Sequence, residues 1–307
     1  MTARPGGDAR ADEWLAAGAA EPALVFLGAP TSALSLSLSR ADTTPPAVRK
    51  ALGRFPLWDA AHTADLAAIG ALDCGDVDMS GPPLEARFRL AGAVREAASA
   101  HPGSALAICG GDNSVTYAGV TGLAWAHQVE LSSGRVGLVT LDAHHDLRAP
   151  SPQPSNGSPV RELLDAGLRG DRVVQVGIAP FGNQRVLTEA AAAAGIHVYG
   201  AAEVRARGAA AVITEVLEHL DVDLLYLDVD FDVLDRAFAP ACPSSLPGGL
   251  LPGDLLDAAF LCGADPRVAA LDLVEVDAEA DVAGITCRTV AAVLLSFAAG
   301  LTRRGAR

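Results

Sequence analysis

Short apolar runs alternate with longer amphipathic segments along most of this 307-residue chain. The runs are rich in Val, Leu and Ile, as is typical of strands buried on both faces of a parallel sheet. Strands alternating with helices predict an α/β fold with a three-layer, mostly parallel, doubly wound sheet. We expect strands at 23–29, 72–77, 104–109, 173–178, 196–199, 223–232 and 268–276 and at the start of 137–148. We expect helices at 45–55, 84–100, 160–166, 184–194, 209–220, 255–261 and 283–301.

With 307 residues, 50% of them hydrophobic, the chain can bury one large core, and length alone makes one domain as likely as two. No low-complexity linker divides the chain, and we predict a single domain over residues 1–307. Residues 1–20 are rich in Gly, Ala and charge, and we expect a loosely ordered N-terminal segment there. The same segment carries acids where a signal peptide needs an apolar core, so a cytoplasmic location is expected. The formal net charge of −14 disfavours nucleic acid and membrane surfaces as partners.

The stretch 137–148 reads G-L-V-T-L-D-A-H-H-D-L-R, an apolar run that ends in potential metal ligands. Ligands of open α/β sheets bind at the carboxyl ends of strands. Asp142, His144 and Asp146 recur at period two, so an extended backbone would aim all three side chains to one side, with His145 facing away. The sequence therefore predicts a metal site at this strand end.

A second apolar run ends in D-V-D-F-D at 228–232. Carboxylates at such density raise one another's pKa unless a cation compensates them. Oxygen ligands with few imidazoles favour Mn²⁺ over Zn²⁺, and a metal pair could activate a bridging water. We interpret Asp228, inside the run, as lying behind the ligands, and Asp112 as a turn or cap residue.

Three motifs resemble the ureohydrolase superfamily, which comprises arginases, agmatinases and formimidoylglutamases. They are G-G-D-N-S at 110–114, D-A-H-H-D at 142–146 and D-F-D-V-L-D-R-A-F-A-P at 230–240. The resemblance covers about residues 20–302 and implies an arginase-like fold. It also implies hydrolysis of a linear amidine C–N bond by metal-bound hydroxide, with one or two Mn²⁺ per chain.

The resemblance further implies roles for individual residues. Asp142 and Asp230 would bridge two metals, Asp146 would complete the first site, and His144 with Asp232 would complete the second. Glu275 would hold the cationic carbon–nitrogen group of the substrate, and Asp146 or water would protonate the leaving group. Two positions depart from the pattern. Asn113 replaces the family's first-site histidine, which predicts a weak first metal or a single-metal site. Asn156 replaces the arginase histidine thought to shuttle protons.

The loops around the motifs are more similar to formimidoylglutamases than to other members. The implied reaction converts N-formimidoyl-L-glutamate to glutamate and formamide. That substrate carries two carboxylates, so Arg148 and Arg161 are the candidate basic residues, with Asn156 and Glu275 as further substrate-binding candidates. Two alternatives stay open: a guanidino-compound hydrolase that releases urea, and a catalytically silent homologue permitted by Asn113. The family also implies a homo-oligomer, a trimer or hexamer.

Overall fold

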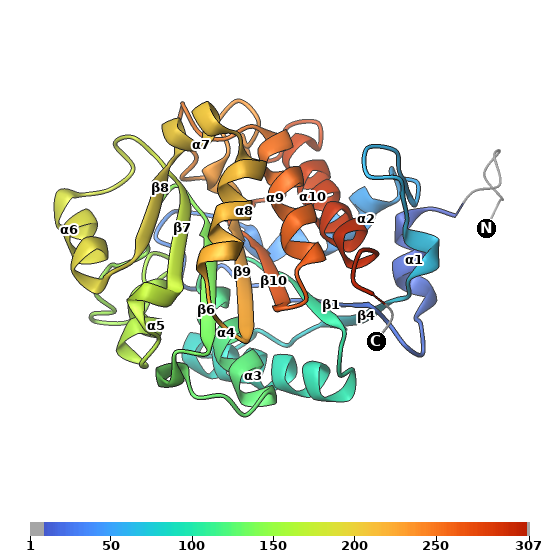
Figure 1. Cartoon of the computed structure of the whole chain (residues 1–307), viewed down its shortest axis with the longest axis horizontal. Helices are drawn as coiled ribbons and strands as arrows, with labels where there is room; N and C mark the ends of the chain where they lie inside the picture. Colours follow the sequence, from blue (N-terminus) through green and yellow to red (C-terminus); the bar gives the residue numbers. More distant parts are fainter. Residues whose placement is uncertain (1–8, 306–307) are drawn as a thin grey trace.

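The computed structural model describes residues 9–305, and an eight-stranded sheet lies at its centre (Figure 1). The strands of this sheet are paired in parallel, which confirms the predicted fold class. In spatial order they are β4 (Ala71–Asp76), β1 (Leu24–Gly28), β5 (Ala105–Cys109), β10 (Val268–Val274), β9 (Leu224–Asp230), β6 (Val136–Leu141), β7 (Val173–Ile178) and β8 (His197–Gly200). A separate antiparallel pair joins β2 (Trp58–Asp59) to β3 (Ala64–Asp65).

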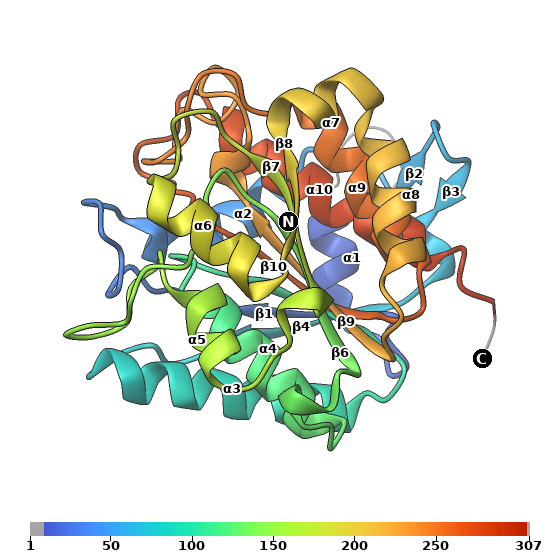
Figure 2. The ribbon, with the colours of Figure 1, turned by 60° about the vertical axis from the view of Figure 1, so that its left-hand side comes forward.

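Helices cover both faces of the sheet (Figure 2). Each face has its own hydrophobic core. One face carries α3 (Pro83–Ala100), α4 (Val115–Ala126), α5 (Pro159–Asp165) and α6 (Arg185–Ala194). The other carries α1 (Ala11–Ala17), α2 (Thr44–Leu52), α7 (Ala201–Arg207), α8 (Ala209–His219), α9 (Pro252–Ala264) and α10 (Ile285–Leu301). Within residues 9–305, no helix is long and apolar enough to cross a membrane.

The strand order brings the motifs together. Strand β6 lies beside β9, β9 beside β10, and β10 beside β5. The carboxyl ends of these four strands therefore meet at one edge of the sheet, where ligands bind in folds of this kind. The loop after β5 carries 110–114, the loop after β6 carries 142–148, and 231–240 follows β9.

The N-terminal segment differs from the expectation. Residues 11–17 form helix α1, and Ala11 and Leu15 are buried one helical turn apart. The Trp14 indole donates a hydrogen bond to the carbonyl of Ile69 (2.9 Å), which anchors the helix beside β4. These apolar contacts order residues 11–17, where composition alone predicts a loosely ordered segment. Residues 1–8 of the predicted segment lie outside the described residues. Helix α7 was not among the predicted helices, and α4 was indicated only by the glycines at 110–111, which mark a turn from strand to helix.

Candidate active site

The chain turns sharply where strand β6 ends at Leu141. The Asp142 carboxylate accepts a hydrogen bond from the His144 backbone (2.6 Å), and Asp146 has a positive φ of 51°. The period-two prediction for 142–146 was therefore wrong about the backbone, because a side-chain-stabilised turn replaces the extended strand. Of the three side chains predicted to converge, His144 and Asp146 line one cavity, and Asp142 brings a ligand atom to within 4.8 Å of one of His144. His145 faces away, and its Nδ1 lies 2.7 Å from Oε1 of buried Gln175.

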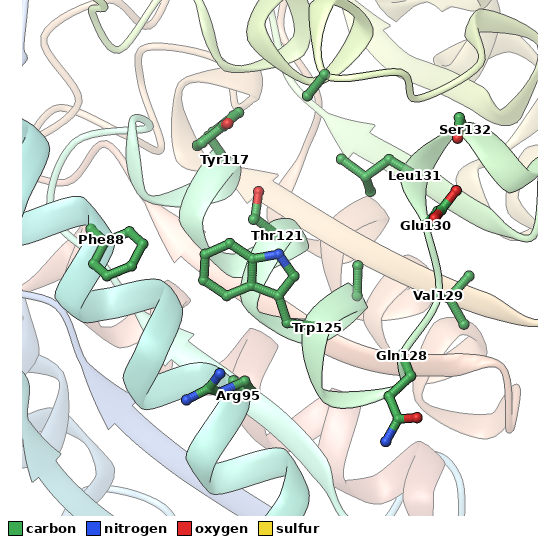
Figure 3. Close-up of a pocket in the computed structure, with 12 residues that line it drawn as sticks. Phe88, Arg95, Tyr117, Thr121, Trp125, Gln128, Val129, Glu130, Leu131 and Ser132 are labelled. Atoms are coloured by element: carbon green, nitrogen blue, oxygen red, sulfur yellow. The ribbon is translucent and has the colours of Figure 1, made fainter.

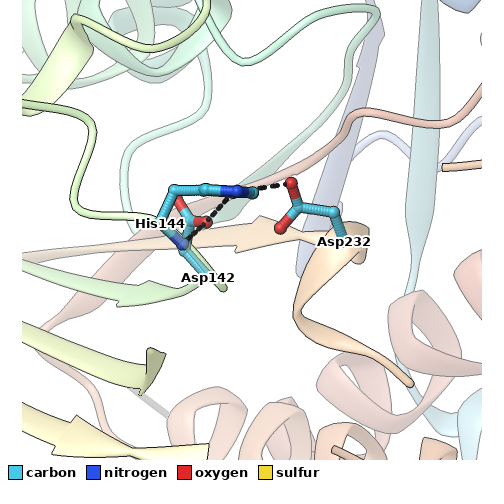
Figure 4. Close-up of side chains that lie close together, drawn as sticks. All are labelled: Asp142, His144 and Asp232. Carbon is cyan, nitrogen blue, oxygen red and sulfur yellow. Dashed lines mark hydrogen bonds and ion pairs between the residues drawn. The ribbon is translucent and has the colours of Figure 1, made fainter. Parts of the chain in front are cut away.

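The end of strand β9 supplies the facing acids. The Asp230 carboxylate accepts a hydrogen bond from the Asp232 backbone (2.8 Å), which sets the short 3₁₀ turn Phe231–Val233. Oδ2 of Asp232 lies 2.9 Å from Nδ1 of His144 (Figure 4). One ligand atom from each of Asp142, His144 and Asp232 lies within 4.8 Å of the others. In the part of the chain that the structure describes, this is the group of three that is compact enough for one metal ion.

Asn113 and Glu275 close the site from the ends of β5 and β10. The backbone N–H of Asn113 donates to Oε1 of Glu275 (2.7 Å), and its side-chain Nδ2 donates to Oδ2 of Asp146 (2.5 Å). Oδ1 of Asn113 accepts a hydrogen bond from the hydroxyl of Thr116 (2.5 Å). The amide thus faces Asp146 with its nitrogen, which cannot ligate a cation, while its oxygen is engaged elsewhere. In this structure the Asn113 side chain therefore links Asp146 to Thr116.

A cavity of about 160 Å³ lies above these groups. Its lining includes His144, Asp146, Asp230, Asp232, Glu275, Arg148 and Asn156. The Asn156 side chain donates to Oε1 of Glu275 (2.8 Å) and accepts from the backbone of Leu36 (3.0 Å), so both ends of its amide are used.

The structure separates the two candidate arginines. Arg148 is exposed on the cavity wall, and its guanidinium has no hydrogen bond or ion pair with any residue in 9–305. Arg161 is not part of the cavity lining and pairs with Asp165 (3.0 Å) on the exposed face of α5. Of the two, Arg148 is the one placed to meet a ligand.

Burial governs the electrostatics of the site. Burial and the neighbouring Asp232 raise the pKa of Asp142 to about 6. Burial and Asp112 raise the pKa of Glu275 to about 8. Burial alone would lower the pKa of His144, but Asp232 and Asp142 raise it to about 12. The fold therefore gathers more carboxyl groups here than one imidazolium can keep ionised.

An orphaned atom supports a metal at this position. Oδ2 of Asp142 is buried and has no hydrogen-bond partner among the described residues. An ionised oxygen in that state is costly without a cation. Carboxylates with one imidazole form a donor set suited to a divalent ion such as Mn²⁺. The residues present therefore fit the predicted metal.

Two parts of the structure behind the site were not predicted to belong to it: the pair of Tyr226 and Asp272, and Thr116. Tyr226 donates its hydroxyl to Asp272 (2.9 Å), and Asp272 pairs in register with Asp228 on the adjacent strand. Both acids are fully buried, consistent with the interpretation of Asp228 as lying behind the ligands. A lone Asp in the apolar run 268–274 was a usable signal for Asp272. No sequence signal pointed to Thr116, because a threonine within a helix is common.

A parallel sheet whose strand ends gather carboxylates, one imidazole and a buried oxygen without a partner forms a candidate metal site of the kind that metal-dependent hydrolases use. A model of the arginase family matches residues 22–300, and the chain belongs to that family. A formimidoylglutamase from Halalkalibacterium halodurans is 35% identical over 280 residues, 90% of this chain and 86% of that protein.

Solved structures agree with this assignment. The crystal structure of formimidoylglutamase from Bacillus subtilis superposes with a TM-score of 0.92 at 28% identity, covering 100% of this chain and 96% of that one. Trypanosoma cruzi formiminoglutamase with Mn²⁺ superposes with a TM-score of 0.87 at 23% identity, covering 97% and 99%. The second likeness, at this lower identity, supports the fold.

Proposed function

We propose that this protein hydrolyses N-formimidoyl-L-glutamate to L-glutamate and formamide in a metal-dependent reaction. The observation that carries the proposal is the placement of Glu275 and Arg148 in one small cavity beside the Asp142, His144 and Asp232 cluster. The Glu275 carboxyl group for the amidine and the Arg148 guanidinium for a carboxylate match the two ends of this substrate. The H. halodurans and B. subtilis relatives, which bear the name formimidoylglutamase, support the same substrate.

We propose manganese as the metal, since the T. cruzi relative is described with Mn²⁺. Asp142, His144 and Asp232 would hold an ion, and Asp230 and Asp146 line the cavity together with His144 and Asp232. When bound, such an ion lowers the pKa of water and so supplies a nucleophile near neutral pH.

The residues around the cavity divide the remaining work. Hydrogen bonds from Asn113 and Asn156 both end on Oε1 of Glu275, so Oε2 is the oxygen we assign to the formimidoyl N–H groups. Arg148, which lines the same cavity, binds a substrate carboxylate. Asp146, whose pKa burial and then Asp142 raise well above the usual value, is placed to give a proton to the leaving amine.

Product identity tests this proposal. The Mn²⁺-loaded protein is incubated separately with N-formimidoyl-L-glutamate, L-arginine and agmatine, and formamide, ammonia and urea are measured. Formamide from the first substrate, with no urea from the others, is the expected result. Urea release would favour a guanidino-compound hydrolase instead. No product from any of the three would favour the catalytically silent alternative.

A further inference from the structure

A groove of about 900 Å³ lies on the face covered by α3 and α4 (Figure 3). Tyr117, Thr121 and Trp125 recur every four residues along α4 and line one wall. Phe88 of α3 lines the other wall, and residues 128–132 are also part of the lining. None of the groove residues belongs to the active-site cavity.

The groove exposes large apolar side chains. Phe88 is 69% exposed and Trp125 is 41% exposed, and their rings meet edge to face with centroids 5.8 Å apart. Leu84, one helical turn before Phe88, is 55% exposed. Contiguous exposed apolar side chains mark interaction sites, and aromatic residues are enriched at the centres of protein interfaces. This strip, comprising Leu84, Phe88 and Trp125, is therefore a candidate contact surface.

Two charges flank the strip. Arg95 on α3 and Glu130, just before the 3₁₀ turn Leu131–Ser133, are the charged residues of the groove lining, and they lie on opposite sides of Trp125 (Figure 3). Neither side chain has a hydrogen bond or ion pair with another residue of the described part of the chain. In a two-fold interface the same surface of both copies is in contact. A residue of the first copy that contacts a second residue of the partner is therefore matched by the same contact with the copies exchanged. A cation and an anion flanking an apolar strip satisfy that requirement.

We propose that this groove is an interface between two copies of the chain related by a two-fold axis. Arg95 of each copy pairs with Glu130 of the other, and the strip forms the apolar centre. A second copy fits better than an unrelated acidic or basic partner, because the lining carries one charge of each sign. The net charge of −14 makes two copies repel, so a charge-balanced surface is where they can meet.

Charge reversal tests the pairing on the full-length protein by sedimentation velocity over a range of concentrations. We expect wild type to form an assembly with an even number of copies. Arg95→Glu or Glu130→Arg alone should weaken it at least about tenfold, because like charges then face each other. The double variant R95E/E130R should recover wild-type association to within about threefold, since the pair is restored with its sign exchanged.

A matched control carries the same change of charge elsewhere. Arg185→Glu alters an exposed residue of α6 that pairs with Glu189 and is absent from the groove lining, so association should stay at the wild-type value. Salt titration is a poor substitute, because screening weakens the proposed pairs and the overall repulsion at once. An odd-numbered or monomeric wild type, single variants that associate like wild type, or a double variant that fails to recover would each overturn the proposal.

The apolar strip provides a second measurement. Trp125→Ser should halve the assembly mass while leaving the melting temperature of the dissociated protein within a few degrees, because the side chain is already partly exposed. Formamide release should also persist, since Trp125 lies outside the active-site cavity; this keeps a failure of the interface distinct from a failure of the proposed function. An unchanged assembly mass would contradict the role of the strip.

Discussion

Arg148 and Arg161 are close in sequence to the same strand, but only Arg148 reaches the cavity. Arg148→Gln should raise the KM for N-formimidoyl-L-glutamate about 10- to 100-fold, because a charge-assisted hydrogen bond contributes about 1.5–3 kcal/mol. The kcat should change far less, since Arg148 does not touch the amidine. Steady-state kinetics check both values. Arg161→Gln is the matched control and should leave KM unchanged; an equal rise in both variants would contradict the assignment.

Asn113 occupies the position where the family pattern has a ligand histidine, and its amide nitrogen donates to Asp146. Asn113→Asp would set two carboxylates against each other, which is unfavourable until a cation lies between them. We expect the metal-free variant to melt at a lower temperature than wild type and to bind Mn²⁺ more tightly, by about tenfold. Melting curves in EDTA and calorimetric Mn²⁺ titration measure the two effects.

Thr116→Val tests whether the Asn113 side chain only supports Asp146 or can also bind the metal ion. It removes the hydroxyl that holds Oδ1 of Asn113, and leaving that oxygen unpaired should cost about 1–2 kcal/mol of stability. The loss should appear with and without Mn²⁺, and affinity should not rise. A rise in Mn²⁺ affinity equal to that of Asn113→Asp would show that the freed amide oxygen is a ligand, against the role inferred here.

At the level of elements, the turn after β5 holds in place the loop 31–37, which forms part of the wall of the active-site cavity. A Cβ at Gly111 would overlap the carbonyl oxygen of Thr31, which accepts a hydrogen bond from Asp112 (2.9 Å). Gly111→Ala should therefore destabilise the protein by about 1–3 kcal/mol and lower activity, because it displaces residues 31–37. Gly92→Ala, in helix α3 with open space around its Cβ position, should be neutral or stabilising. Chemical denaturation compares the two; equal losses would contradict a local role for Gly111.

The elements that carry the site could be predicted because their apolar runs are long and continuous. The carboxylates at the ends of β6 and β9 follow from the apolar runs and the motifs. The neighbouring positions of the two strands do not, because β7 and β8 separate them in the chain. Two local features could not be predicted. The turn at 142–146 depends on a side-chain hydrogen bond from within the motif, and the direction of the Asn113 amide depends on Thr116, whose position is set only when α4 packs beside β10.

For the whole molecule, the buried acids couple stability to pH. The pKa of Glu275 is raised from 4.5 to about 8 and that of Asp142 from 3.8 to about 6, while the pKa of His144 is raised from 6.5 to about 12. Each group binds its proton more tightly in the folded protein than in the unfolded chain. Between about pH 5 and 8 the metal-free folded state therefore holds more protons, and its stability falls as pH rises. Acids with a lowered pKa, such as Asp265, change the stability only below this pH range.

Melting temperatures in EDTA and in excess Mn²⁺, at pH 6 and pH 8, test this coupling. In EDTA the protein should melt at a higher temperature at pH 6, because Glu275 is then protonated in the fold. Mn²⁺ binds the ionised carboxylates, so the stabilisation it gives should be larger at pH 8. Glu275→Gln removes one group that binds its proton more tightly in the folded protein, so the melting temperature in EDTA should depend less on pH. A metal-free protein that is equally stable or more stable at pH 8 would mean that the cluster is already compensated by groups of the chain itself.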